Sequence, residues 1–267
     1  AALALWRLAY FRPQEPPSAP QAPSGPQRGA YLVNGLGHCS ACHSERNLLG
    51  ANRGPGDVAG GLIPMQGWYA PALASLHEPS AAQWSSQELV AFLSTGISSR
   101  AQAMGPMAEV VRQSTQHLSA TDLQAMAEHL RTLPHLPTPP AIQLGRDAAR
   151  PGAGPTTVDA GTRLYERHCA QCHGKSGEGV PGAYPALAGN ASVQRANPVN
   201  ALQMILYGGF APVTAGNPRP YGMPPFVLSL SDAELAAVLN TIRSSWGNRA
   251  APLSEPELQR LREATLR

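Results

Sequence analysis

The sequence predicts a mainly α-helical protein built from two copies of one small unit, joined by a linker rich in proline and glycine. Three observations support this. One short motif occurs twice, and apolar residues at helical spacing follow each copy. Residues 134–157, between the copies, contain six prolines and three glycines without an apolar period. No convincing run of alternating polar and apolar residues indicates a strand.

The repeated motif is Cys-x-x-Cys-His, at residues 39–43 and 169–173, and it uses all 4 cysteines. This motif is typical of covalent haem c attachment, in which both thiols bond the porphyrin and the histidine coordinates iron. A redox dithiol or a zinc site is the alternative, but neither explains the repeated histidine and the wide separation of the motifs. We therefore expect two covalently bound haem c groups, attached through Cys39, Cys42, Cys169 and Cys172, with His43 and His173 as metal ligands.

The first unit opens with a short helical segment at residues 29–33, just before its motif. After a long glycine-rich and proline-rich loop, Ser85 and Glu88 form a capping-box pattern that predicts a helix ending at Gly96. A closing helix is expected to begin after Ser119.

The second unit repeats this order. Residues 161–165 precede its motif, a helix begins at Pro198 and ends at Gly208, and Ser231 starts the closing helix. Residues 253–266 indicate a terminal helix. The predicted organisation is an N-terminal segment at 1–27, a first domain at 28–134, a linker at 135–157, a second domain at 158–248 and a C-terminal tail at 249–267.

Residues 1–11 are mostly apolar and carry aromatic residues near their end. They are too few to span a bilayer. We interpret them as the remnant of a signal peptide or of an inner-membrane anchor. An apolar helix packed on its own domain or on a partner is the alternative.

Composition narrows the class of protein. Charged residues make up only 14% of the chain, the net charge is +3, and Lys175 is its one lysine. Without a basic run or interleaved aromatic and basic residues, nucleic-acid binding has no support.

A methionine is the expected sixth iron ligand. Met223 lies between a glycine and two prolines, in a rigid loop before the second closing helix, whereas Met204 lies on a helix stripe that favours packing. In the first unit Met107 holds the corresponding place, with Met104 as the main alternative. Met65 and Met126 are less suitable, one in a loop and one on a helix stripe.

Other residues are candidates for the haem surroundings. Pocket walls are expected from Trp68, Tyr69, Pro71, Tyr184 and Pro185, and pairing with haem propionates from Arg46, Arg53 and Arg219. For these arginines a solvent-exposed role is at least as well supported.

Both units resemble class I c-type cytochromes, so the expected fold is two tandem domains of that class. The sequence is also similar to the multihaem cytochrome subunit of membrane-bound alcohol and gluconate dehydrogenases, and matches its last two haem domains. The resemblance is carried by Gly67-Trp68-Tyr69-Ala70-Pro71, Gly105-Pro106-Met107, Tyr221-Gly222-Met223-Pro224-Pro225-Phe226 and Ser245-Trp246-Gly247-Asn248. It implies Met107 and Met223 as axial ligands. Two-haem relatives also serve molybdenum hydroxylases and haem–copper oxidases.

The leading hypothesis is an electron-transfer protein and not an enzyme. It would pass single electrons from a periplasmic dehydrogenase to a downstream cytochrome or terminal oxidase, and lie in the periplasm, anchored to the inner membrane. A dihaem redox enzyme, such as a peroxidase or a sulfur-compound oxidoreductase, would need an open iron position, which two well-placed methionines disfavour. A haem-based sensor would need a signalling domain, and none accompanies the motifs.

Overall fold

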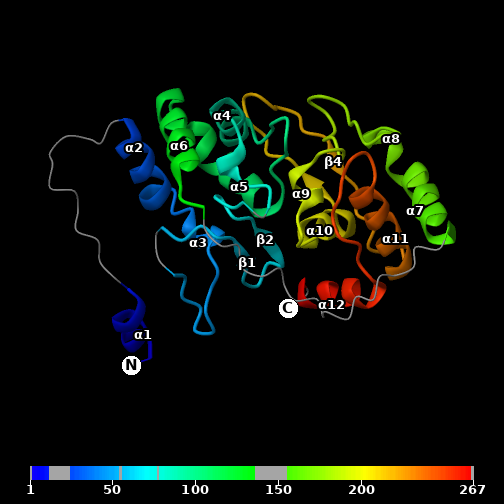
Figure 1. The fold of residues 1–267 in the computed structure, drawn as a ribbon. Helices are drawn as coiled ribbons and strands as arrows, with labels where there is room; N and C mark the ends of the chain where they lie inside the picture. The colour runs from blue at the N-terminus through cyan, green and yellow to red at the C-terminus, as the bar shows by residue number, and fades with distance from the viewer. Residues whose placement is uncertain (1, 12–24, 54–55, 77, 136–154, 266–267) are drawn as a thin grey trace.

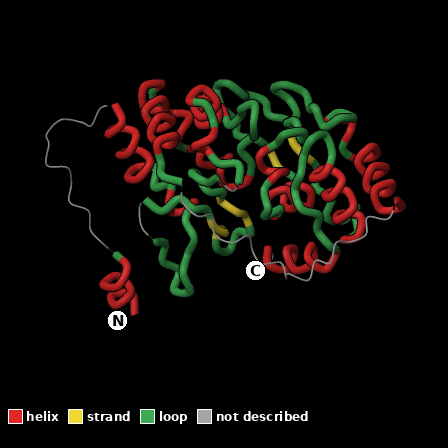
Figure 2. Tube along the Cα trace, viewed as in Figure 1, coloured by secondary structure: helices red, strands yellow, loops and turns green. Residues whose placement is uncertain are grey.

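A computed structural model describes the chain except residues 1, 12–24, 54–55, 77, 136–154 and 266–267. Its described part forms two mainly helical domains side by side, coloured blue to green in the first and light green through yellow to red in the second (Figure 1). Helices and loops dominate, and the strands are short (Figure 2). The predicted mainly α fold is confirmed.

The first domain follows an N-terminal helix α1 (Ala2–Tyr10). Its elements are α2 (Gly25–Tyr31), a π-helical turn η1 (Leu32–Leu36), α3 (Ser40–His43), β1 (Gly61–Ile63), β2 (Trp68–Ala70), η2 (Ala81–Gln83), α4 (Ser86–Thr95), α5 (Gly105–Gln113), η3 (Thr115–His117) and α6 (Ala120–Thr132). Ser85 and Glu88 form the predicted capping box, and Gly96 ends α4 in the left-handed conformation at φ 78°.

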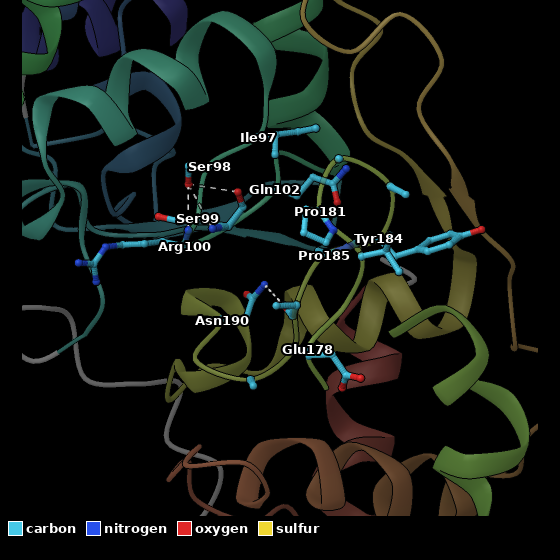
Figure 3. A pocket seen from close by; sticks show the side chains of 16 residues that line it. Ile97, Ser98, Ser99, Arg100, Gln102, Glu178, Pro181, Tyr184, Pro185 and Asn190 are labelled. Carbon is cyan, nitrogen blue, oxygen red and sulfur yellow. Dashed lines mark hydrogen bonds between the residues drawn. The ribbon is translucent and has the colours of Figure 1, made fainter. Parts of the chain in front are cut away.

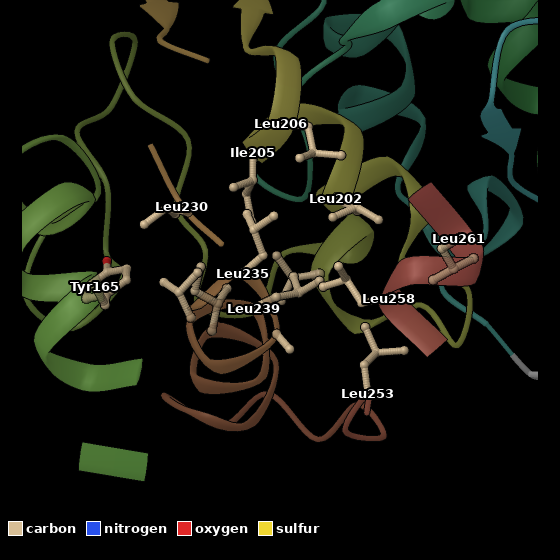
Figure 4. Packing of buried hydrophobic residues seen from close by; sticks show 14 residues of the cluster. Tyr165, Leu202, Ile205, Leu206, Leu230, Leu235, Leu239, Leu253, Leu258 and Leu261 are labelled. Atoms are coloured by element: carbon tan, nitrogen blue, oxygen red, sulfur yellow. The ribbon is translucent and has the colours of Figure 1, made fainter. Parts of the chain in front are cut away.

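The second domain contains α7 (Pro155–His168), α8 (Ala170–His173), α9 (Ala191–Gln194), α10 (Val199–Tyr207), β3 (Gly209–Phe210), β4 (Gly222–Met223), α11 (Asp232–Ser244) and α12 (Glu255–Thr265). Helix α7 begins within the segment that the sequence assigns to the linker, most of which lies outside the described residues. Ser231 and Glu234 cap α11 as predicted. Leu253, Leu258 and Leu261 join the buried cluster of this domain, so α12 packs on it (Figure 4).

In each domain the helix before the motif packs against the closing helix: α2 on α6, and α7 on α11. A glycine sits at each crossing. A side chain at Gly29 would run into the Ala125 carbonyl, and one at Gly161 into Thr241 Oγ1 and the Ala237 carbonyl. Glycine therefore allows the two backbones to approach closely, which positions the start of each motif.

The four strands form two antiparallel pairs, β1 with β2 and β3 with β4. Each strand has only 2 or 3 residues. A strand is predicted from a longer run of alternating polar and apolar residues, so the sequence gives no signal for these short strand pairs.

Hydrogen bonds join the two domains. Asn200 at the start of α10 receives a bond from Tyr69 N at 2.8 Å and donates one to Tyr69 O at 2.7 Å. Gln203 donates to Gly67 O at 3.0 Å. These bonds attach α10 of the second domain to β2 of the first.

Helix α1 has no buried residue, and Trp6 donates a hydrogen bond to Leu49 O at 2.9 Å. Among the residues described here, none of the helices combines the length and apolar character needed to cross a membrane.

Candidate haem sites

The first motif places His43 at the end of α3, within hydrogen-bond distance of a loop carbonyl. Nδ1 of His43 lies 2.6 Å from Pro71 O, just after β2. Because a carbonyl can only accept, Nδ1 carries the proton and donates it. The lone pair of the ring is then on Nε2, the nitrogen free to bind a metal.

The second motif repeats this arrangement at the end of α8. Nδ1 of His173 lies 2.9 Å from Pro185 O. The sequence interval from histidine to proline is 28 residues in the first domain and 12 in the second. The same tautomer is therefore selected by loops of very different length.

Burial lowers the pKa of His43 and of His173, and the bonds to the proline carbonyls only partly oppose this. The charge of Arg195 lowers the pKa of His43 further. Both imidazoles are thus held neutral at neutral pH, the form that coordinates iron.

The four cysteines form no disulfide with one another. Burial raises the pKa of Cys39 and of Cys169 to about 11. A redox-active dithiol depends on a lowered thiol pKa, whereas the shift at Cys39 and Cys169 is in the opposite direction. Within the described ranges, no three or more His, Cys, Asp or Glu side chains gather as a metal site. Two thiols beside one neutral imidazole, in each domain, fit covalent haem c.

The two candidate axial methionines occupy different kinds of element. Met107 lies in the first turn of α5, a helix that the sequence analysis did not identify, and Met223 lies in β4, paired with Gly209. Met107 packs against the buried cluster that Cys39 also contacts. Met223 packs against the second cluster, together with Cys169.

The remaining methionines lie elsewhere. A side chain at Gly209 would begin 3.9 Å from Met104 Cε and 3.8 Å from Met204 Cε, so both thioethers approach the domain junction. Met126 is buried in the first cluster, and Met65 is 92% exposed.

The arginines expected near propionates have other partners. Arg46 donates to the carbonyls of Ala41 and Gly50, and Arg53 pairs with Glu45 at 3.0 Å. Arg219 is exposed. No sequence pattern predicts a role for Arg195, which is buried at the domain junction and donates to Pro79 O at 3.0 Å. An isolated arginine in a loop has no motif or period that would identify it.

A pocket of about 400 Å³ lies between the domains, between the segment at 97–102 and the loop at 178–190 (Figure 3). Tyr184 and Pro185 line it, but none of the cysteines, motif histidines or candidate axial methionines does. This pocket is therefore an opening at the domain junction beside the second site, and not the site itself.

The helical fold and the paired thiol–imidazole sites define a class of proteins that bind haem c covalently. The family model for cytochrome c matches residues 27–134 and 158–246. The chain belongs to the cytochrome c family, whose cofactor is covalently bound haem c.

The chain is similar to the cytochrome c subunit of alcohol dehydrogenase (quinone) from Gluconobacter oxydans (strain 621H), with 37% identity over 97% of this chain and 56% of that protein. It is 33% identical to the gluconate 2-dehydrogenase cytochrome c subunit of Pantoea cypripedii, over 93% of this chain and 58% of that protein. A diheme cytochrome c-type protein of Cereibacter sphaeroides is 38% identical over 40% of this chain and 35% of its own. The chain spans about half the length of the two dehydrogenase subunits.

Proposed function

We propose that the chain binds two haem c groups and carries single electrons between redox proteins. In this proposal the first haem is attached to Cys39 and Cys42 and the second to Cys169 and Cys172, with His43 and Met107 as ligands of one iron and His173 and Met223 of the other. The observation that carries the proposal is the repeated bond from a motif histidine to a proline carbonyl, which leaves Nε2 for iron in both domains.

The packing of the methionines supports their assignment. Met107 shares a buried cluster with Cys39, whereas Met104 approaches Gly209 of the other domain. Met223 shares a cluster with Cys169. A methionine thioether favours ferrous iron and raises the potential, as an electron carrier requires.

The haem supplies the one-electron chemistry when bound. Pro71 and Pro185 orient the two motif histidines, which would hold the irons together with Met107 and Met223. This ligand set would leave no iron position for a substrate. The electron donor would be a dehydrogenase, as the names of the relatives suggest. The acceptor would be a downstream cytochrome or a terminal oxidase.

We place this activity in the periplasm, because bacterial haem c attachment occurs outside the inner membrane. Helix α1 exposes Leu3, Leu5 and Leu8 and is suited to lie against a membrane or a partner subunit.

The haem content tests this function directly. We expect the intact mass of the matured protein to include two haem groups that survive acid–acetone extraction. A single haem, or none after complete maturation, would contradict the proposal.

Carbon monoxide tests the axial positions, because it binds ferrous iron only at an open or labile site. Two methionine-ligated haems should bind it slowly and incompletely at neutral pH. Rapid, stoichiometric binding to native protein would favour a dihaem enzyme.

A further inference from the structure

Arg195 follows α9 in the second domain, but its guanidinium lies against the first. Its Nη2 donates to Pro79 O of the first domain at 3.0 Å, and its Nη1 donates to Ser192 Oγ at 3.2 Å. The residue is 6% exposed. A permanent positive charge is therefore buried where the two domains meet.

The hydrogen bonds of this guanidinium are incomplete. Nε of Arg195 has no partner within the described part of the chain, and Arg195 forms no ion pair there. A buried charge is costly unless it is paired and its donors are satisfied. Nε of Arg195 can therefore donate to one further acceptor, and an anion there would also offset the buried charge.

Arg243 shows what a satisfied buried arginine looks like in the same domain. It is 1% exposed, and its three nitrogens donate to the carbonyls of Val193, Arg195 and Ala251. Burial of an arginine in this chain therefore does not by itself leave a donor unpaired. The incomplete set at Arg195 is specific to the domain junction.

The position of Arg195 indicates which anion is missing. The Pro79 carbonyl that Arg195 binds directly follows Glu78 in the chain. Glu78 is bonded in turn to Ala72 N, next to the Pro71 carbonyl that meets His43 Nδ1. Glu78 is the nearby carboxylate, but its Oε1 accepts bonds from Tyr69 Oη at 3.3 Å and from Ala72 N at 2.7 Å. Arg195 therefore lies beside the loop that orients the proximal histidine of the first haem site.

We propose that Arg195 binds a propionate of the first haem across the domain junction, using the Nε donor that is otherwise unpaired. This rests on the proposed function, since it requires haem c at Cys39 and Cys42. The second domain then supplies a cofactor-binding residue to the first. A positive charge beside the propionate favours the ferrous state, so docking of the second domain raises the potential of the first haem.

The test uses full-length protein matured with haem whose propionate carboxyl carbons are labelled with ¹³C. Redox-difference infrared spectra then identify the propionate bands by their isotope shift. A Met223→His background lowers the potential of the second haem and separates the two couples. Arg195→Gln is compared with Arg100→Gln, which removes the same charge from an exposed arginine paired with Glu88.

We expect Arg195→Gln to shift a labelled propionate band and to move the ferric–ferrous equilibrium of the first haem about tenfold toward ferric, or about 59 mV for one electron. Arg100→Gln should change neither.

Unchanged labelled bands in Arg195→Gln, or equal shifts of both haem potentials, would overturn the proposal. If Arg195→Gln does not fold, Arg195→Lys tests the proposal instead. Lysine keeps the positive charge but lacks the planar donors of the guanidinium, so a labelled propionate band is still expected to shift. The haem content of the background protein tests the proposed function separately.

Discussion

In the first domain, 28 residues separate the motif histidine from the proline whose carbonyl it meets, whereas 12 residues separate them in the second. The bond is nevertheless the same. In both domains a helix precedes the motif, and a glycine of that helix lies against the closing helix. The proximal side of the site is thus independent of the intervening loop, because the helix crossing and the motif position the histidine.

The two methionines proposed as axial ligands come from different kinds of element. Met107 lies at the start of α5, and Met223 lies in a strand paired with Gly209. The first domain also receives Asn200 and Arg195 from its neighbour. We infer that the first site depends on docking of the second domain. Four predictions test this difference, in order of decreasing effect.

The largest effect is expected from the methionines. Met107→Ala and Met223→Ala should each convert one haem to high spin or to a replacement ligand and lower its potential, because the thioether ligand is lost. Optical and magnetic circular dichroism spectra measure this. Met104→Ala and Met204→Ala are the matched controls and should leave both haems methionine-ligated. A change with Met104→Ala, but not with Met107→Ala, would reassign the ligand of the first domain.

The helix crossings come next. Gly29→Ala and Gly161→Ala should each destabilise the protein by about 1–3 kcal/mol, since the new methyl group overlaps the closing helix. Gly29→Ala should destabilise the protein more. Its methyl group would first meet the Ala125 backbone carbonyl, whereas a methyl group at Gly161 would first meet the Thr241 side chain. Thermal unfolding monitored by circular dichroism measures both. Gly35→Ala is the control, as its methyl group would only touch Tyr31 at 3.8 Å. Equal stability of all three variants would refute the role of the crossing.

Asn200→Ala tests the dependence of one domain on the other. It leaves both backbone groups of Tyr69 without their partner, at a cost of about 1–3 kcal/mol. Calorimetry should show the first domain unfolding at a lower temperature, separated from the second. Asn240→Ala is the control, because the Asn240 side chain likewise bonds both backbone groups of one residue, Leu253, which packs in the core of the second domain. If Asn240→Ala separated the transitions equally, the junction would not be responsible.

The smallest effect is electrostatic. The first domain joins α2 to α6 through Arg28 and Asp122, at 2.7 and 3.0 Å, and the second joins α11 to α12 through Arg262 and Asp232. The hydrogen bond from Arg28 holds the pKa of Asp122 below its usual value, about 3.9. This stabilisation is therefore present above that pH and is lost as the pH falls through the lowered pKa.

Asp122→Asn should accordingly lower the melting temperature slightly at pH 7, and the difference from wild type should close in acid. Glu128→Gln removes a carboxylate from the same helix and serves as the control. A difference that persists at all pH values would mean that the loss is steric and not electrostatic.

Local signals allowed much of this protein to be predicted. The two attachment motifs, the capped helices after Ser85, Ser119 and Ser231, and the helix-ending glycine at Gly96 depend on residues within a few positions of each other. Met107 and Met223 were also identified as candidates, although their elements were not: α5 and β4 are a separate helix and a two-residue strand.

The sequence by itself determined the class of cofactor, the helical character and the duplication, because covalent attachment and helix capping act over a few residues. Only the tertiary structure decided that Pro71 and Pro185 orient the histidines, that Asn200 joins the domains, and that Arg195 donates to Pro79 of the first domain. These contacts join residues 12 to 131 positions apart. No periodic pattern encodes such pairs, since they form only when packed helices bring distant loops together.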